Sequence, residues 1–239
     1  MRPMLDPRIG KGMRLLGNPS LLRVFLQHRV VASFEHRALP EKSYATVVDI
    51  GAHTGQFSLL VRSRYPAAMV HAFEPLPEAA AKFREVFEAD PRVLLHEAAI
   101  APVSGETTLY LDGAWDGGSL LPPVSSVREV PVRAAPLEEF LAADEIHSPA
   151  LLKLDVQGFE AEALLGCRSL LERFDDVVVE LMLVEDRAGQ PLAADVIALL
   201  RDEGFQLVGL DAFGRRNGRI HRFDGIFSRL RSHAVDGRR

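Results

Sequence analysis

The segment VVDIGAHTGQFS, residues 47–58, constrains the fold of this chain more than any other part of the sequence. A short β-branched run ends at Asp49 and Ile50, glycines stand at positions 51 and 55, and apolar residues at helical spacing follow. Glycine adopts positive φ and allows another backbone or a ligand to approach closely. This strand, loop and helix start is therefore typical of an α/β fold that binds a ligand at the loop.

The apolar pattern elsewhere predicts alternating strands and helices. Short apolar runs are expected to form buried strands, at 45–50, 69–74, 92–100, 150–155 and 176–183. Segments with apolar residues at helical spacing are expected to form helices, at 55–65, 77–90, 136–143, 158–173 and 191–203. This alternation predicts a Rossmann-like, doubly wound and mostly parallel sheet with right-handed crossovers. Two last runs, 205–210 and 220–228, flank a turn and predict a closing hairpin.

An insertion interrupts this alternation after the third strand. Two extended segments, 105–112 and 127–133, flank the loop GAWDGGSLLPPVSS. A loop of more than about 12 residues in a compact domain is often a lid. Trp115 is expected either to cover a bound ligand or to plug the sheet edge.

The chain is predicted to hold one main domain. We expect an N-terminal helical extension at 1–40 with an amphipathic helix at 21–37, a ligand-binding domain at 41–230, and a basic flexible tail at 231–239. The single Cys167 excludes an internal disulfide and favours a reducing compartment. No apolar run is long enough to span a membrane, and the first residues lack the apolar core of a signal peptide. A cytoplasmic location is the resulting expectation.

The charge of the chain is unevenly distributed. The net charge is -5, although residues 1–40 and 210–239 each carry +5. The basic ends either contact an anionic partner or are solvated. The acidic middle argues against a nucleic acid as substrate, because it would repel phosphates.

The residues around the glycine loop favour a nucleoside that has no phosphates. No Lys follows Gly55 as a Walker loop requires, and His53 occupies the position of the second glycine in GxGxxG. Asp49 at the strand end would repel a pyrophosphate but attract a cation. Glu74 follows Gly51 by 23 residues, close to the spacing of a ribose-binding acid, and Pro75 fixes the turn that presents it. S-adenosylmethionine, a nucleoside with a sulfonium, fits this pattern. The alternative is that both glycines only permit a tight turn.

Five segments resemble the FkbM-type methyltransferases, which belong to the class I S-adenosylmethionine-dependent enzymes. They are VVDIGAHTGQFS, VHAFEP, LHEAAIAPVSGETTLYL, LLKLDVQGFEAEALLG and VVVEL, and together they span about residues 45–182. The resemblance implies a seven-stranded sheet with an antiparallel last strand, and methyl transfer to a hydroxyl oxygen of a small molecule, sugar or natural product. His53 stands where this family usually has Asn, and Gln157 where many members have Glu.

The candidate cofactor-binding residues combine the glycine loop, the second-strand acid and the end of the third strand, where this fold meets the adenine edge. They are Asp49, Gly51, His53, Thr54, Gly55, Glu74, Pro75, Glu97 and Ala98.

The candidate catalytic residues lie on later strands whose carboxyl ends should face the cofactor. Asp155 is expected to face the acceptor hydroxyl as a base or a metal ligand, or else to order its loop. Lys153 alternates with Asp155 on one strand face, and either pairs with it or orients the substrate. Glu180 lies in the apolar run VVVELML and is either catalytic or part of a structural salt bridge. Asp155 and Glu180 could contribute to a magnesium site, but no tight cluster indicates a metal.

The methyl acceptor is expected to be a small molecule or a sugar. The chain lacks the aromatic turn used for methylation of DNA amines, and Cys167 lies in a helical segment instead of a nucleophile loop. Two other functions remain open at this point: a non-catalytic adenosyl-binding module, and an NAD-dependent dehydrogenase that the missing GxG disfavours. A homodimer supported by the N-terminal helix is a further possibility.

Overall fold

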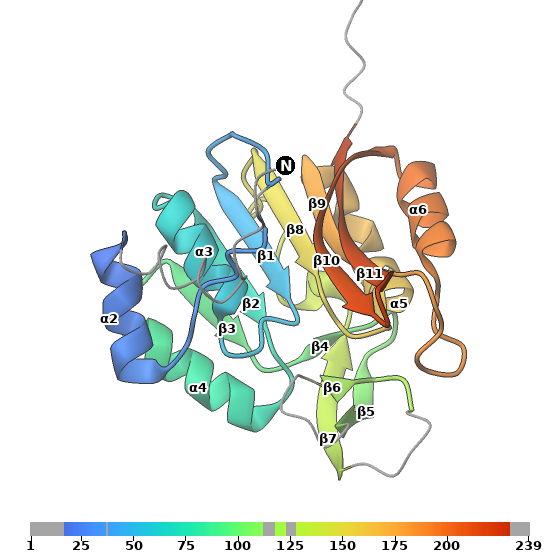
Figure 1. Ribbon diagram of the computed structural model, residues 1–239, viewed down its shortest axis with the longest axis horizontal. Helices are drawn as coiled ribbons and strands as arrows, with labels where there is room; N and C mark the ends of the chain where they lie inside the picture. The colour runs from blue at the N-terminus through green and yellow to red at the C-terminus, as the bar shows by residue number, and fades with distance from the viewer. Residues whose placement is uncertain (1–16, 37, 112–117, 123–127, 230–239) are drawn as a thin grey trace, which may run out of the picture.

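Seven strands form the central sheet in the order β10-β11-β9-β8-β1-β2-β3 (Figure 1). The computed structural model of the chain describes residues 17–36, 38–111, 118–122 and 128–229. The strands of this sheet are β1 Thr46–Ile50, β2 Met69–Phe73, β3 Val93–His96, β8 Ala150–Leu154, β9 Asp176–Met182, β10 Phe205–Arg216 and β11 Arg219–Arg229. Pairing is parallel from β3 to β9, and β11 runs antiparallel to both β9 and β10. The predicted mostly parallel, seven-stranded sheet with an antiparallel closing hairpin is confirmed.

Helices cover both faces of this sheet. They are α2 Pro19–His28, α3 Gln56–Arg64, α4 Pro77–Phe87, α5 Glu160–Gly166 and α6 Ala193–Asp202, with 3-10 turns at Leu137–Glu139 and Arg168–Arg173. In Figure 1, α2, α3 and α4 lie on one side of the sheet and α5 and α6 on the other.

The alternation of side chains along β1 explains this layering. Val47 packs with Phe57 of α3, whereas Val48 and Ile50 pack into the cluster that contains Leu164 of α5. All five residues of β1 are buried, as expected for a parallel strand covered on both faces.

A second, four-stranded sheet lies beyond the carboxyl ends of the central strands (Figure 1). Its strands, in the order β4-β7-β5-β6, are β4 Ala99–Ile100, β5 Gly105–Leu111, β6 Gly118–Ser119 and β7 Arg128–Ala135. The extended segments predicted in the insertion are thus paired with each other, and they form a small sheet that the sequence pattern did not predict.

Four predicted elements differ markedly in extent from those observed. The expected strand 92–100 is interrupted, because the Ala98 N–H donates to His96 O and residues 99–100 pair with β7 instead. The helix expected at 21–37 ends at His28, where Arg29 adopts a φ of 61° and its N–H donates to Phe25 O.

The other two differences concern helices. The helix expected at 158–173 divides at Cys167 into α5 and a 3-10 turn. At 136–143 only a short 3-10 turn forms. Trp115 and the tail at 231–239 lie outside the described residues, and the domain limits stay predictions. Among the described residues no helix is long and apolar enough to cross a membrane.

The strand order places the topological switch point between β1 and β8. From β1 the chain continues outward through β2 and β3, whereas from β8 it continues in the opposite direction through β9. Ligands in open α/β sheets bind beyond the carboxyl ends of the strands at such a point. The segments that follow β1 and β8 are therefore where a site is expected.

We predict that Gly166→Ala destabilises the protein. The direction is opposite to the usual one, because replacing glycine by alanine within a helix normally stabilises it by about 0.5–1 kcal/mol. A Cβ at Gly166 would lie 2.7 Å from the carbonyl carbon and 2.8 Å from the oxygen of Ala101, which are backbone atoms. Overpacking of this kind costs about 1–3 kcal/mol. The free energy of unfolding in urea measures the effect.

Gly105→Ala is the matched control, because a Cβ there meets nothing within 4 Å. Equal stability of the Gly166→Ala variant and the wild type would show that α5 does not pack against Ala101 as described.

Candidate functional site

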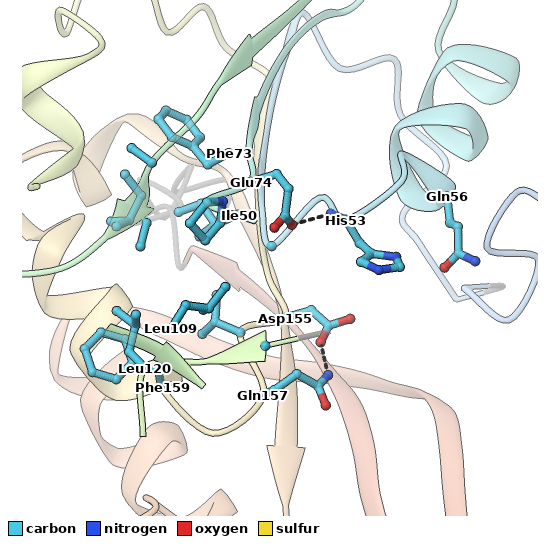
Figure 2. Close-up of a pocket in the computed structure, with 17 residues that line it drawn as sticks. Ile50, His53, Gln56, Phe73, Glu74, Leu109, Leu120, Asp155, Gln157 and Phe159 are labelled. Atoms are coloured by element: carbon cyan, nitrogen blue, oxygen red, sulfur yellow. Dashed lines mark hydrogen bonds between the residues drawn. The ribbon is translucent and has the colours of Figure 1, made fainter. Parts of the chain in front are cut away.

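Two adjoining cavities open at the switch point. The inner cavity, of ≈ 130 Å³, is defined by lining residues that include Phe73, Glu74, Ala98, Leu109 and Phe159 (Figure 2). The outer cavity, of ≈ 890 Å³, is defined by lining residues that include His36, Lys153, Glu180, Arg187 and Arg222. Residues shared by the two linings mark the junction between them: Gly51, His53, Gln56, Asp155 and Gln157.

The two glycines of the loop are required by the protein's own packing. Gly51 has a φ of +78°, and a Cβ there would lie 1.9 Å from the backbone oxygen of Asp155. Gly55 has a φ of +91°, and a Cβ there would lie 2.4 Å from the Phe87 ring of α4. Gly51 therefore allows the ends of β1 and β8 to meet, and Gly55 allows α4 to pack against the loop.

Glu74 holds the glycine loop from the neighbouring strand. Its Oε2 accepts from the His53 N–H at 2.7 Å (Figure 2), and its Oε1 accepts from the Leu76 N–H at 2.8 Å. The side chain is buried at the wall of the inner cavity. Burial raises the pKa of Glu74 to about 7, although the two backbone donors act in the opposite direction. The carboxylate has acceptor positions left for a ligand.

Lys153 contacts the end of β1 as well as lining the outer cavity. Its Nζ lies 3.1 Å from Asp49 Oδ1 and 3.9 Å from Asp155 Oδ2, and it donates to Gly51 O at 2.9 Å. Burial lowers the pKa of Lys153, but the carboxylates of Asp49 and Asp155 outweigh this effect, so the pKa lies above its ordinary value. Asp49, fully buried, also accepts from Ser58 Oγ at 2.8 Å. The cation near Asp49 is thus Lys153 of the same chain.

Asp155 presents a partly exposed carboxylate at the junction of the cavities. Its Oδ1 accepts from Gln157 Nε2 at 2.7 Å (Figure 2), and the same amide reaches Glu180 Oε2 at 3.3 Å. Glu180 in turn forms an ion pair with Arg222 of β11. Burial, followed by the Asp155 charge, holds the pKa of Glu180 well above its usual range, while Arg222 opposes this rise. The Gln157 amide therefore orients Asp155, and Glu180 of β9 in turn holds that amide in place.

The backbone at the junction adopts an uncommon conformation in two places. His53 has a φ of 49° and Gln157 a φ of 54°, in the left-handed region that non-glycine residues rarely occupy. Such residues cluster at functional sites, where the surrounding structure holds them in place. Glu160 stabilises the second of these turns by accepting from the N–H groups of Val156 and Gly158, each at 3.1 Å.

The predicted cofactor residues divide into those that reach the inner cavity and those that do not. Its lining includes Gly51, His53, Glu74, Pro75 and Ala98. The residues Asp49, Thr54, Gly55 and Glu97 are not part of this lining. The Glu97 carboxylate pairs with Arg84 instead, and the Ala98 N–H is already used by His96 O.

The predicted catalytic residues Lys153, Asp155 and Glu180 all line the outer cavity. Three further residues that line the same cavity were not among the predicted catalytic residues. Gln157 follows Asp155 by two positions, and Arg222 lies on the last predicted strand, yet only the fold brings both to Glu180. His36, the third, lies far earlier in the chain, and nothing in the sequence indicates its position. No group of three or more His, Cys, Asp or Glu suited to a metal ion exists among the described residues.

Comparison with known proteins gives one family. A family model described as the methyltransferase FkbM domain matches residues 49–207. The 2-O-methyltransferase NoeI of Sinorhizobium fredii is 28% identical over 76% of this chain and 78% of its own length. The hexuronic acid methyltransferase AglP of Haloferax volcanii is 24% identical over 66% of this chain and 67% of its own length.

Among solved structures, a methyltransferase FkbM from Methylobacillus flagellatus superimposes with a TM-score of 0.54 at 14% identity. The match covers 82% of this chain and 46% of that protein, so this chain spans less than half the length of that relative. At this identity the similarity shows a shared fold.

We predict that Lys153→Met lowers the free energy of unfolding by about 3–5 kcal/mol, because it leaves the buried Asp49 charge without its cation. The double variant Asp49→Asn, Lys153→Met removes both charges and is expected to recover a large part of this loss. Lys82→Met is the control, since the exposed Lys82–Glu85 pair contributes little. Denaturant unfolding measures all three. A Lys153→Met variant as stable as the wild type would contradict a structural role for this ion pair.

Proposed function

The chain belongs to the FkbM methyltransferase family, and from this membership we propose that it transfers the methyl group of S-adenosylmethionine to a hydroxyl oxygen of a sugar or a similar small molecule. The observation that carries this proposal is the junction of the two cavities. There an inner cavity lined by Glu74 and Asp155 meets a larger polar cavity at Asp155.

The lining of the inner cavity fits a nucleoside with a positive charge. Its described lining residues include Glu74 and Asp155 but no Lys or Arg, so the acids there would repel a pyrophosphate with no lining cation to offset them. Phe73, Leu109 and Phe159 supply apolar walls for an adenine ring. We assign Glu74 to the ribose hydroxyls, because its buried carboxylate can accept from both.

The outer cavity supports a hydroxyl-rich acceptor. Charged and polar side chains line it, among them Glu35, Arg187, Gln190 and His221. Polar linings of this kind suit sugars, whose hydroxyls need hydrogen-bond partners when they leave water. The names of the two relatives, a 2-O-methyltransferase and a hexuronic acid methyltransferase, are in line with a sugar hydroxyl as the acceptor.

The proposed chemistry at the junction requires little of the protein beyond orientation and a base. S-adenosylmethionine supplies a methyl group on a positively charged sulfur, which leaves as a neutral thioether. Asp155 would accept the proton of the hydroxyl as its oxygen bonds to the methyl carbon. Gln157 and Lys153 keep the Asp155 carboxylate in place. Holding the acceptor oxygen in line supplies much of the remaining acceleration.

We predict that the affinity for 5′-methylthioadenosine, which carries no group that titrates near neutrality, depends on Glu74. The pKa of Glu74 is raised to about 7, and ribose hydroxyls donate to the carboxylate form. Affinity should therefore rise about tenfold between about pH 6 and pH 8, as Glu74 loses its proton. Isothermal titration calorimetry at each pH measures the affinity of the wild type and of Glu74→Gln. The variant should bind the nucleoside weakly at every pH.

Glu88→Gln is the control for this titration, because Glu88 is exposed at the end of α4 and lines neither cavity. Tight and pH-independent binding by Glu74→Gln would remove Glu74 from the ribose site. A wild type that fails to bind the nucleoside would overturn the cofactor assignment itself.

We predict that Asp155→Asn lowers kcat for methyl transfer by about 100-fold or more, since the amide cannot accept the hydroxyl proton. Transfer from radiolabelled S-adenosylmethionine to a panel of methyl hexosides, deoxyhexosides and hexuronides provides the assay. Affinity for 5′-methylthioadenosine should stay within about threefold. Asp144→Asn, at an exposed loop position, is the control. Unchanged turnover in Asp155→Asn would exclude Asp155 as the base.

A further inference from the structure

The two cavities differ in whether all of their lining residues lie within the part of the chain that the family model matches. Every described residue that lines the inner cavity falls between 49 and 207, within the matched domain. The outer cavity draws part of its wall from outside this range. Those residues are Ser33, Glu35 and His36 before it, and Gly214, Arg215, Arg216, His221 and Arg222 after it. The part of the cavity that faces the acceptor is thus built partly from segments that the family pattern does not specify.

The first of these segments is the N-terminal strap, defined here as residues 29–36 and 38–40. It has no helix or strand of its own, so contacts to other elements hold it in place. The Ser33 N–H donates to Gln56 O at the start of α3 at 3.0 Å. The Ala38 N–H donates to Asp211 Oδ2 of β10 at 2.6 Å. The strap therefore connects the glycine loop side of the outer cavity with its hairpin side.

His36 is the side chain that fixes the strap between these two points. Its Nε2 lies 3.3 Å from Asp224 Oδ2 on β11, and its ring lies 5.0 Å from the Phe57 ring. Both members of the pair are 9% exposed. Burial lowers the pKa of His36 and raises that of Asp224 to about 8. The approach of Nε2 to Asp224 Oδ2 is a buried polar contact between the strap and β11.

The position of Asp224 connects this clamp with the reacting end. Asp224 pairs in register with Glu180 of β9, which Gln157 links to Asp155. The other charged groups close to the His36–Asp224 pair are Glu35, Lys153, Asp155, Asp211 and Arg222. A shift of the strap would therefore alter the wall of the outer cavity next to Asp155, whereas the strap contributes no residue to the lining of the inner cavity.

We propose that the His36–Asp224 clamp holds the N-terminal strap as a wall of the acceptor cavity, and that His36 is a positioning residue through which the strap determines which acceptor binds. The proposal rests on the proposed function, because it takes the outer cavity as the acceptor site. It assigns acceptor choice to the strap and the closing hairpin, and cofactor binding to the matched domain.

The first test needs no acceptor. His36→Phe keeps a ring against Phe57 but removes the polar contact with Asp224, and His36→Gln keeps a polar side chain there. Glu41→Gln, at an exposed position next to the strap, is the control. Hydrogen–deuterium exchange of the full-length protein should be about tenfold faster at the Ser33 and Ala38 amides in His36→Phe only. The His53 amide and the affinity for 5′-methylthioadenosine should not change. Unchanged exchange at Ser33 and Ala38 overturns the clamp.

The second test uses the methyl glycoside on which the wild type is most active. In His36→Phe the KM for that glycoside should rise about tenfold with kcat within about twofold, and His36→Gln should recover most of the loss. Faster strap exchange with an unchanged KM would make the strap structural only and would overturn its role in acceptor choice. A wild type that binds 5′-methylthioadenosine but methylates no glycoside would instead overturn the acceptor class of the proposed function. The exchange result would then decide the clamp alone.

Discussion

The buried ion pair between Lys153 and Asp49 is the interaction on which the site depends. It joins β8 to β1 at the switch point, and Lys153 also donates to the Gly51 carbonyl that begins the loop. Removing either charge alone would leave the other buried without a partner, a costly state in a low-dielectric interior. The Lys153–Asp49 pair therefore helps to position the glycine loop, the Asp155 carboxylate and both cavities.

A second set of contacts passes outward from this pair along the strand ends. Asp155 is held by Gln157, Gln157 is shared with Glu180, and Glu180 pairs with Arg222. Asp155 has its donor in the segment that follows β8 and Glu180 has its partner on the neighbouring strand β11, so the two acids can lie close together without being left unpaired. Of the two carboxylates in this set, Asp155 is the more exposed, at 38% of its side chain against 6% for Glu180, which suits a group that must meet a substrate.

Much of the fold and part of the site could be predicted from the sequence. The short apolar runs at 45–50 and 150–155 correctly predicted two central strands, and the segment KLDVQGFE correctly placed Lys153 and Asp155 at one strand end. The prediction of Asp49 as a direct cofactor ligand did not foresee Lys153, because the two residues are 104 positions apart and meet only through parallel pairing. The pairing of the Glu97 carboxylate with Arg84 was likewise not predicted from the sequence.

The sequence by itself determined the alternation of elements, the parallel sheet and the position of the glycine loop, because these follow from local patterns of apolar residues and from backbone freedom at glycine. Tertiary structure alone decided which charges neutralise one another and where the cavity walls come from. Lys153 meets Asp49, Arg222 meets Glu180, and His36 meets Asp224 across long sequence separations. Such partners carry no local signal, since side-chain pairing depends on strand order and register, which are settled only when the whole sheet has formed.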